Sequence, residues 1–248
     1  MKIFTPAFVL FLFIYLGSAS LFIKKVEAED IKNIAGNITQ VKNLDEQARA
    51  IVARPDTADT ADIQAIKDKV VLGSSKASLW QPDAKFFSYR RVFSLPDNVS
   101  KSDQITAQAD SYYFESKNTR DVSEILFDRN SNNILRIDTN PNQLRNYANN
   151  FSDILTIKVG PKKALEIAML SPDFQSYKQS HDQILTYVVL NAVQNVPIGS
   201  NVTQYWFVGM GRSFSDQNGV QALVNIQTGE LVSKEAINII NQINSRGQ

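Results

Sequence analysis

The alternation of apolar and polar positions is clearest over residues 203–232, where it predicts three strands of an antiparallel meander. Residues 220–224 alternate at the period of a β-strand, and the YWFV run at residues 205–208 is aromatic and β-branched, as strands prefer. Gly229 stands in a QTGE sequence, where a tight hairpin needs a residue with positive φ. This pattern predicts a strand, a second strand and a closing hairpin.

A diverged copy of the same pattern precedes it in the chain. The aligned ranges are 112–114 (YYF) with 205–207 (YWF), and 127–135 with 224–232 without a gap. Asn132 then falls on Gly229, and asparagine is among the few residues besides glycine that tolerate the left-handed conformation. We expect Asn132 and Gly229 to occupy equivalent turns with positive φ.

The likeness extends upstream of both meanders. Residues 88–93 can be laid on 186–191, and the helical pattern at 62–66 on that at 161–165. The chain is therefore predicted to be a tandem repeat of a helix followed by three or four strands. In the first repeat we expect a helix over 61–72 that ends at Gly73. In the second, the apolar strand at 184–193 should be covered by the helix on one face and by the companion repeat on the other.

The N-terminal segment is predicted to enter a membrane. Residues 3–23 are almost wholly apolar, with Lys2 before them and Lys24 and Lys25 after them. About 20 apolar residues suffice for a helix that spans the hydrocarbon layer, and this length favours a retained anchor over a cleavable signal peptide. Cleavage before Glu29 stays open as the alternative, which would make the protein secreted. We expect the remainder of the chain to face the periplasm or the cell exterior.

Residues 29–53 follow as an amphipathic helix, which we describe as a stalk. Its first part carries a narrow apolar stripe formed by Ile31, Ile34, Ile38 and Val41. The stripe has two interpretations: packing on the protein's own domain, or contact with a protein partner or a second copy of the chain.

These elements give an α+β fold class, with two helix-plus-antiparallel-sheet repeats behind an N-terminal transmembrane helix and the stalk helix. A capped terminal helix is predicted from Ser233 onward. The predicted organisation is 1–28 membrane anchor or signal segment, 29–57 stalk helix, 58–140 first repeat, 141–158 connector, and 159–248 second repeat with its C-terminal helix.

The composition excludes several classes of function. The chain has 43% apolar residues and a net charge of +1, which argues against nucleic acid as a partner. It has no cysteine, and His181 is its only histidine, so thiol chemistry and a histidine-rich metal site are excluded. We expect His181 to be solvated, and we expect no cofactor and no metal.

The acidic and the aromatic residues suggest two further functions, hydrolysis and ligand stacking. Carboxylates gather at Glu115, Asp121 and Glu124, and near Glu27, and acid/base hydrolysis needs no histidine. Solvation of the surface is the simpler interpretation of these acids. The aromatic residues at 112–114 and 205–207 could form a stacking platform, but on strands of both repeats they are more typical of a core.

Four Asn-X-Ser/Thr sequences are glycosylation acceptors if the host has that machinery. They begin at Asn37, Asn98, Asn150 and Asn201.

Three stretches of the second repeat resemble a PepSY-type domain: GPKKALEIA at 160–168, YWFV at 205–208 and VNIQTGEL at 224–231. In that family, a helix with an "eAl..A" pattern precedes strands that end in a "v.vd..tGe.." hairpin. Asn225 stands where the family usually has aspartate, and the first repeat matches less well. The resemblance implies a non-catalytic module outside the cytoplasm, of a kind proposed to restrain peptidases or to sit in envelope assemblies. It transfers no catalytic residue.

From these patterns we expect a membrane-anchored, extracytoplasmic and non-enzymatic interaction module, a subunit or accessory of an envelope assembly with a protein partner or self-association. One alternative is a PepSY-type inhibitor or modulator of a secreted or membrane peptidase, and another is a carboxylate-based hydrolase.

Overall fold

The computed structural model describes residues 43–95, 108–116, 118–119, 121–140, 157–191, 204–213, 216 and 218–232. A helix over residues 43–53 comes first. The further helices and strands are α3 (Thr57–Ala77), β1 (Lys85–Ser94), β2 (Ala109–Glu115), β3 (Val122–Asp128), β4 (Ile134–Asn140), α5 (Pro161–Ala168), α6 (Pro172–Ser180), β5 (Leu185–Asn191), β6 (Tyr205–Gly211), β7 (Val220–Asn225) and β8 (Leu231–Val232). The predicted α+β class is confirmed.

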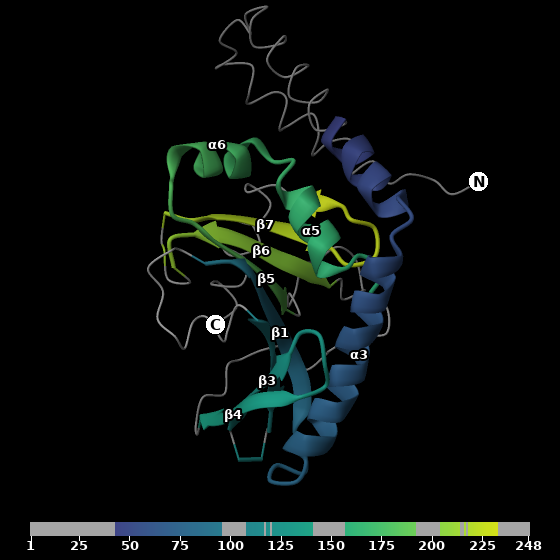
Figure 1. Ribbon diagram of the computed structural model, residues 1–248, viewed down its shortest axis with the longest axis vertical. Helices are drawn as coiled ribbons and strands as arrows, with labels where there is room; N and C mark the ends of the chain where they lie inside the picture. Colours follow the sequence, from purple (N-terminus) through teal and green to yellow (C-terminus); the bar gives the residue numbers. More distant parts are fainter. Residues whose placement is uncertain are drawn as a thin grey trace, which may run out of the picture. The chain divides into compact units, whose positions relative to one another are not determined.

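The eight strands of the described residues form one antiparallel sheet in the order β4-β3-β2-β1-β5-β6-β7-β8. The second four strands therefore mirror the first four about the central β1–β5 pair, in which Arg90 lies opposite Val189. We expected β5 to be covered on its second face by the companion half, and this is wrong. The two halves join edge to edge in a single sheet (Figure 1).

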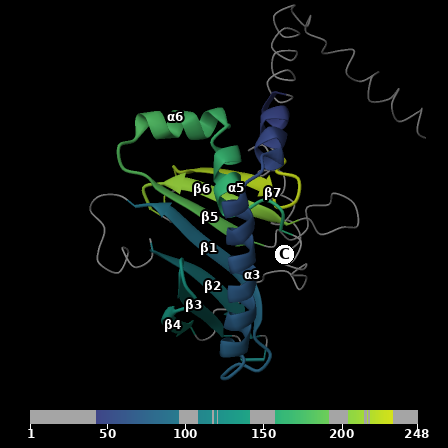
Figure 2. The same cartoon turned by 45° about the vertical axis from the view of Figure 1, so that its right-hand side comes forward.

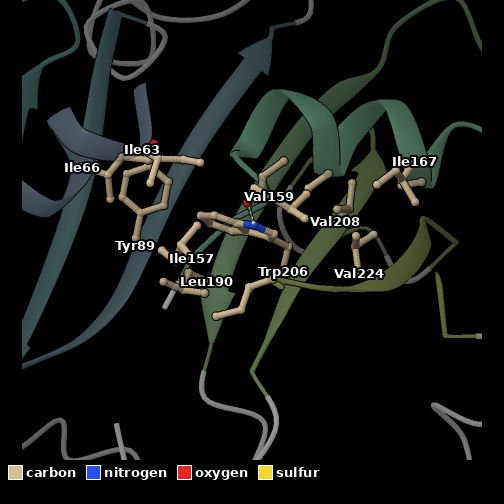
Figure 3. Close-up of a cluster of buried hydrophobic side chains, with 14 of the residues drawn as sticks. Ile63, Ile66, Tyr89, Ile157, Val159, Ile167, Leu190, Trp206, Val208 and Val224 are labelled. Atoms are coloured by element: carbon tan, nitrogen blue, oxygen red, sulfur yellow. Dashed lines mark hydrogen bonds between the residues drawn. The ribbon is translucent and has the colours of Figure 1, made fainter. Parts of the chain in front are cut away.

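The helices lie on one face of this sheet. Contacts place α3 over β1, β2 and β3, and α5 over β5, β6 and β7, as the two views in Figures 1 and 2 also show. The main core lies between these layers. Trp206 is at its centre, fully buried, with its indole N–H donating to the carbonyl oxygen of Val159 at 2.7 Å (Figure 3).

Helix α3 begins where its sequence supplies a cap. The Asp56 side chain accepts the backbone N–H of Asp59 at 3.0 Å, which satisfies one of the orphan donors of the first turn. The predicted end at Gly73 is wrong, because α3 continues to Ala77. Gly73 instead provides space: a Cβ there would overlap the ring of Phe114, which is fully buried beneath the helix.

The two predicted hairpins share the spacing of their paired residues and several of their turn bonds. Phe127 pairs with Ile134 in the first, and Val224 pairs with Leu231 in the second. Inside each turn, a backbone N–H donates across the hairpin at 2.9 Å, from Asp128 to Asn133 and from Asn225 to Glu230. Each turn is also held by its Asp or Asn side chain, which accepts the N–H two residues later at 2.9 and 2.8 Å.

The upstream strand alignments are wrong in register. Tyr112 faces the helices in the main core, whereas Tyr205, to which the sequence aligned it, belongs to a cluster with Leu223 on the other face. Tyr89 and Tyr187 are separated in the same way. Because side chains alternate between the faces of a strand, an alignment displaced by an odd number of residues exchanges core and opposite-face positions.

The helix over residues 43–53 packs against the second half of the sheet. Ala48 is buried in the main core, and Ile51 and Val52 pack against it. The predicted membrane segment at residues 3–23 lies outside the described residues, as does the predicted helix after Ser233. Within the described residues, no helix has the length and apolar character needed to cross a membrane.

Gly229 has φ of +72°, as predicted, and a Cβ at this position would overlap the Val52 side chain. We expect Gly229→Val to lower the free energy of unfolding by about 1–3 kcal/mol, because a β-branched residue in this conformation is strained. Chemical denaturation measures the change. The equivalent Asn132→Val tests whether the first turn also needs positive φ, at an exposed site where no such overlap is added. Unchanged stability of Gly229→Val would contradict the role given to this turn.

Candidate functional site

A buried ionic cluster lies between α3 and the first half of the sheet. The Arg91 guanidinium on β1 donates to Asp110 on β2, with Nε to Oδ1 at 3.0 Å, and to Asp62 on α3, with an N–O distance of 2.8 Å. Asp110 accepts further bonds from the Tyr89 hydroxyl at 2.8 Å and from Arg129 at 3.1 Å. The cluster therefore ties α3 to strands β1 and β2.

The protonation states of this cluster suit a structural role. Burial alone would raise the pKa of the Asp110 carboxyl, but the hydrogen bonds and charge of Arg91, with the charge of Arg129, lower it below its ordinary value. Burial raises the pKa of the Tyr89 hydroxyl, so that it stays protonated and donates to Asp110. A carboxylate with a lowered pKa and three donors is a poor general base at neutral pH.

A second polar junction joins α3, α5 and the chain before α3. The Lys163 ammonium donates to the carbonyl oxygens of Val52 and Arg54 at 3.3 and 3.0 Å and lies 3.8 Å from Asp59 Oδ2. Asp59 also accepts the backbone N–H of Gly160 at the start of α5. Burial raises the pKa of the Asp59 carboxyl, although Gly160 and Lys163 oppose the rise.

Asp59 should give the protein an unusual pH dependence. As pH falls through its raised pKa, the folded chain binds a proton more tightly than the unfolded chain does, so the free energy of unfolding increases. We therefore expect wild type to gain stability relative to Asp59→Asn on acidification through this window. Urea denaturation over a pH series measures the difference, and Asp68→Asn, at an exposed position of α3, controls for loss of a charge. Parallel curves, or a gain by Asp59→Asn, would contradict the assignment.

A pocket of about 400 Å³ opens on the helix-covered face, at the end where β1, β5 and β6 meet the helices. Most of its wall is apolar, and the described residues contribute one carboxylate, Asp182, and one cation, Lys178. The residues that line it are Ser94, Leu95, Leu165, Met169, Lys178, Asp182, Gln183, Ile184, Thr186 and Met210. Such a wall, with a few polar groups, suits an apolar side chain or segment that carries a polar atom.

The residues predicted as sites from the sequence divide into two groups. The stripe Ile31, Ile34, Ile38 and Val41 and the glycosylation acceptors Asn37, Asn98, Asn150 and Asn201 lie outside the described residues. Among the described ones, the aromatic strands supply core: Tyr112, Phe114 and Trp206 are fully buried.

Of the acids and the histidine singled out in the sequence, Glu124 and His181 have structural partners, and Glu27 lies outside the described residues. Glu124 accepts from Arg90 at 3.0 Å and from the Tyr113 hydroxyl at 2.7 Å. His181 is half-buried, with its ring stacked on that of Tyr177 at 4.0 Å between centroids. In the described part of the chain, no group of three histidine, aspartate or glutamate residues is placed to hold a metal ion.

Sequence reasoning missed the pocket altogether. Its wall comes from the end of β1, from α5, from α6 and the segment after it, and from β5 and β6. Its first and last residues, Ser94 and Met210, are 116 positions apart in the chain. Met169 and Met210 carry the only recognisable signal, since methionine is frequent at adaptable apolar sites. That signal does not distinguish a pocket from a core.

The described residues thus form an α+β domain with helices on one face of an antiparallel sheet and a partly apolar pocket on that face. No family model matches the chain, and no curated protein matches it. Among solved structures, it is similar to a predicted lipoprotein of Clostridium difficile 630, with 14% identity over 68% of this chain and 90% of that one and a TM-score of 0.37.

Proposed function

We propose that the protein is a non-enzymatic, membrane-anchored and extracytoplasmic interaction module whose two halves are PepSY-like repeats. The mirrored strand order and the two hairpins with matching pairs and turn bonds support the repeat. In the first half, Asp128 stands at the position of Asn225, and aspartate is the residue that the family pattern has there. The anchor is proposed from the apolar residues 3–23.

The proposed binding of a protein partner rests on the pocket. Its apolar wall receives an apolar side chain of a protein partner, and burial of that side chain contributes about 1.5–3 kcal/mol to binding. Lys178 and Asp182 supply one positive and one negative group for the polar atoms of the same partner segment. An exposed partner segment of mixed apolar and polar character therefore fits this site.

The arrangement of acids favours binding over hydrolysis. A carboxylate-based hydrolase places two carboxyl groups about 5–9.5 Å apart around the bond that it cleaves. Among the residues that the structure describes, Asp182 is the one carboxylate that lines the pocket, and the Asp62, Asp110 and Glu124 side chains are engaged in ion pairs elsewhere. This difference supports a binding role.

Filling the pocket tests the proposal. The full chain carrying Ser94→Trp, which projects an indole into the pocket, should lose the co-purifying protein from gently solubilised membranes of its source cells. Ser75→Trp is the matched control, because Ser75 lies exposed on α3, away from the pocket wall. Thermal melts establish that both variants fold. Equal co-purification by the two variants, or cleavage of the partner by wild type, would refute the proposal.

A further inference from the structure

Strand β4 forms one margin of the sheet over seven residues, Ile134–Asn140 (Figures 1 and 2). It exposes two large apolar side chains, with Leu135 45% exposed and Ile137 41% exposed. Natural edge strands are commonly shortened, charged or covered, because an open edge pairs readily with another strand. At the opposite margin, β8 has only two residues. The β4 edge is therefore the longer of the two margins.

The direction of the peptide groups on β4 follows from the bonds of β3. The N–H of Arg129 donates to Gln108, beside β2, and the N–H of Asp128 donates to Asn133, in the turn before β4. The N–H and C=O groups of successive residues point to opposite sides of a strand. Those of odd-numbered β3 residues therefore point toward β2, and those of even-numbered residues point toward β4. Ile137 lies opposite the odd-numbered residue Ile125, so its own N–H and C=O point away from β3, toward the margin at which the described residues form no further strand.

The charged side chains of β4 favour one register for a second strand along this edge. Arg136 and Asp138 are exposed neighbours on β4, with Arg136 Nε and Asp138 Oδ2 at 2.6 Å. An antiparallel copy of β4 centred on Ile137 places Arg136 opposite Asp138 of the second copy, and Asp138 opposite its Arg136. A register centred on Arg136 or on Asp138 brings two like charges face to face instead. Opposite charges across a ladder stabilise it and like charges destabilise it.

We infer that two copies of this chain associate through β4, antiparallel and centred on Ile137, so that their sheets continue into one another. Two features select this register together: the outward peptide groups of Ile137 can exchange both hydrogen bonds with those of the second Ile137, and the charges match on both sides. The partner is a second copy because the strand is complementary to itself. This inference is independent of the pocket and of the proposed function.

A third apolar side chain lies close to the same edge. The Trp80 indole is 39% exposed, and its N–H donates to the Ser123 hydroxyl at 3.1 Å. Ser123 is opposite Thr139 across the β3–β4 pair. In the inferred register Thr139 lies opposite Leu135 of the second copy.

Cysteine cross-linking tests the inference directly, because the natural chain has no cysteine. In the full chain in its membrane or in detergent, Ile137→Cys should form a disulfide-linked homodimer under mild oxidation. Directly opposed residues that exchange both hydrogen bonds have Cα atoms about 5.5 Å apart, within the range that a disulfide spans. Val71→Cys, 69% exposed on α3, is the control and should remain largely monomeric.

Charge reversal tests the register. In the Ile137→Cys background, Arg136→Asp alone should lower the cross-linking rate about tenfold, because it places like charges opposite each other at two positions. Asp138→Arg alone should do the same, and the double variant Arg136→Asp with Asp138→Arg should restore the rate. Equal rates for Ile137→Cys and Val71→Cys, or no rescue by the double variant, would overturn the inference. So would a cross-link from Ile137→Cys to a different protein in place of the homodimer.

Discussion

Replacing Asp110 by alanine is expected to lower the free energy of unfolding by about 3–5 kcal/mol. Asp110 is fully buried and accepts bonds from Arg91, Arg129 and Tyr89. Its removal leaves the Arg91 guanidinium, itself buried, with Asp62 as its remaining carboxylate. The loss of a partner from a buried ion pair is costly mainly because the other charge stays in a poorly solvating environment.

The same carboxyl group should steepen the loss of stability in acid. Its pKa is lowered in the folded chain, so its contribution is present above the ordinary pKa of aspartate and is lost as pH falls through the folded value. Urea denaturation at neutral and acid pH measures both effects. The exposed Asp68→Ala is the control and should change the free energy by less than about 0.5 kcal/mol. A similarly small effect of Asp110→Ala would show that the cluster does not hold α3 to the sheet.

Trp206→Ala should destabilise the protein by about 3–5 kcal/mol. The indole is fully buried, packs edge-on against Tyr89 with ring centroids 5.8 Å apart, and donates to Val159. Tyr89 is on β1 and Trp206 on β6, so this contact joins the two halves across β5. We therefore also expect the halves of wild type to unfold in one transition.

Trp206→Phe separates packing from hydrogen bonding. It keeps most of the apolar volume but leaves the Val159 carbonyl without its indole donor, and a loss of about 1–3 kcal/mol is expected. Denaturation followed by both fluorescence and circular dichroism measures the variants. Two separated transitions in wild type, or equal losses for the alanine and phenylalanine variants, would contradict this account of the core.

The hairpins were predictable from the sequence because turn chemistry is local. Asp128 and Asn225 hold their turns with their own side chains, and Gly229 supplies the positive φ. Such features need only residues that are close in the chain. The seven-residue spacing between paired positions in each hairpin could be aligned without knowledge of the fold.

The register of the preceding strands could not be predicted, because their residues do not reveal which face they occupy. In the run 112–114, Tyr112 and Phe114 face the helices, while Tyr113 bonds Glu124 on the other face. An aromatic residue at every position removes the alternation that distinguishes the faces. The end of α3 was misjudged for a related reason: Gly73 makes room for Phe114, a contact between segments about forty residues apart.

The pocket and the edge depend on strand order, which local patterns do not specify. Leu165 and Met210 line one pocket only because α5 lies over the second half of the sheet. Ile137 is exposed because β4, and no other seven-residue strand, is placed at a margin of the described sheet. These placements follow from the pairing of β1 with β5, which joins the two halves.

Site-specific photo-cross-linking in intact source cells tests the central claim most directly. A photo-reactive residue replaces Ile184 in the pocket wall of the full chain, and in a second strain it replaces Val71 on α3. We predict one discrete protein adduct from position 184, none from position 71, and loss of the adduct when Ser94→Trp is added. Identical adducts at both positions, no adduct at position 184, or an adduct that survives Ser94→Trp would contradict the claim that this pocket holds a protein partner.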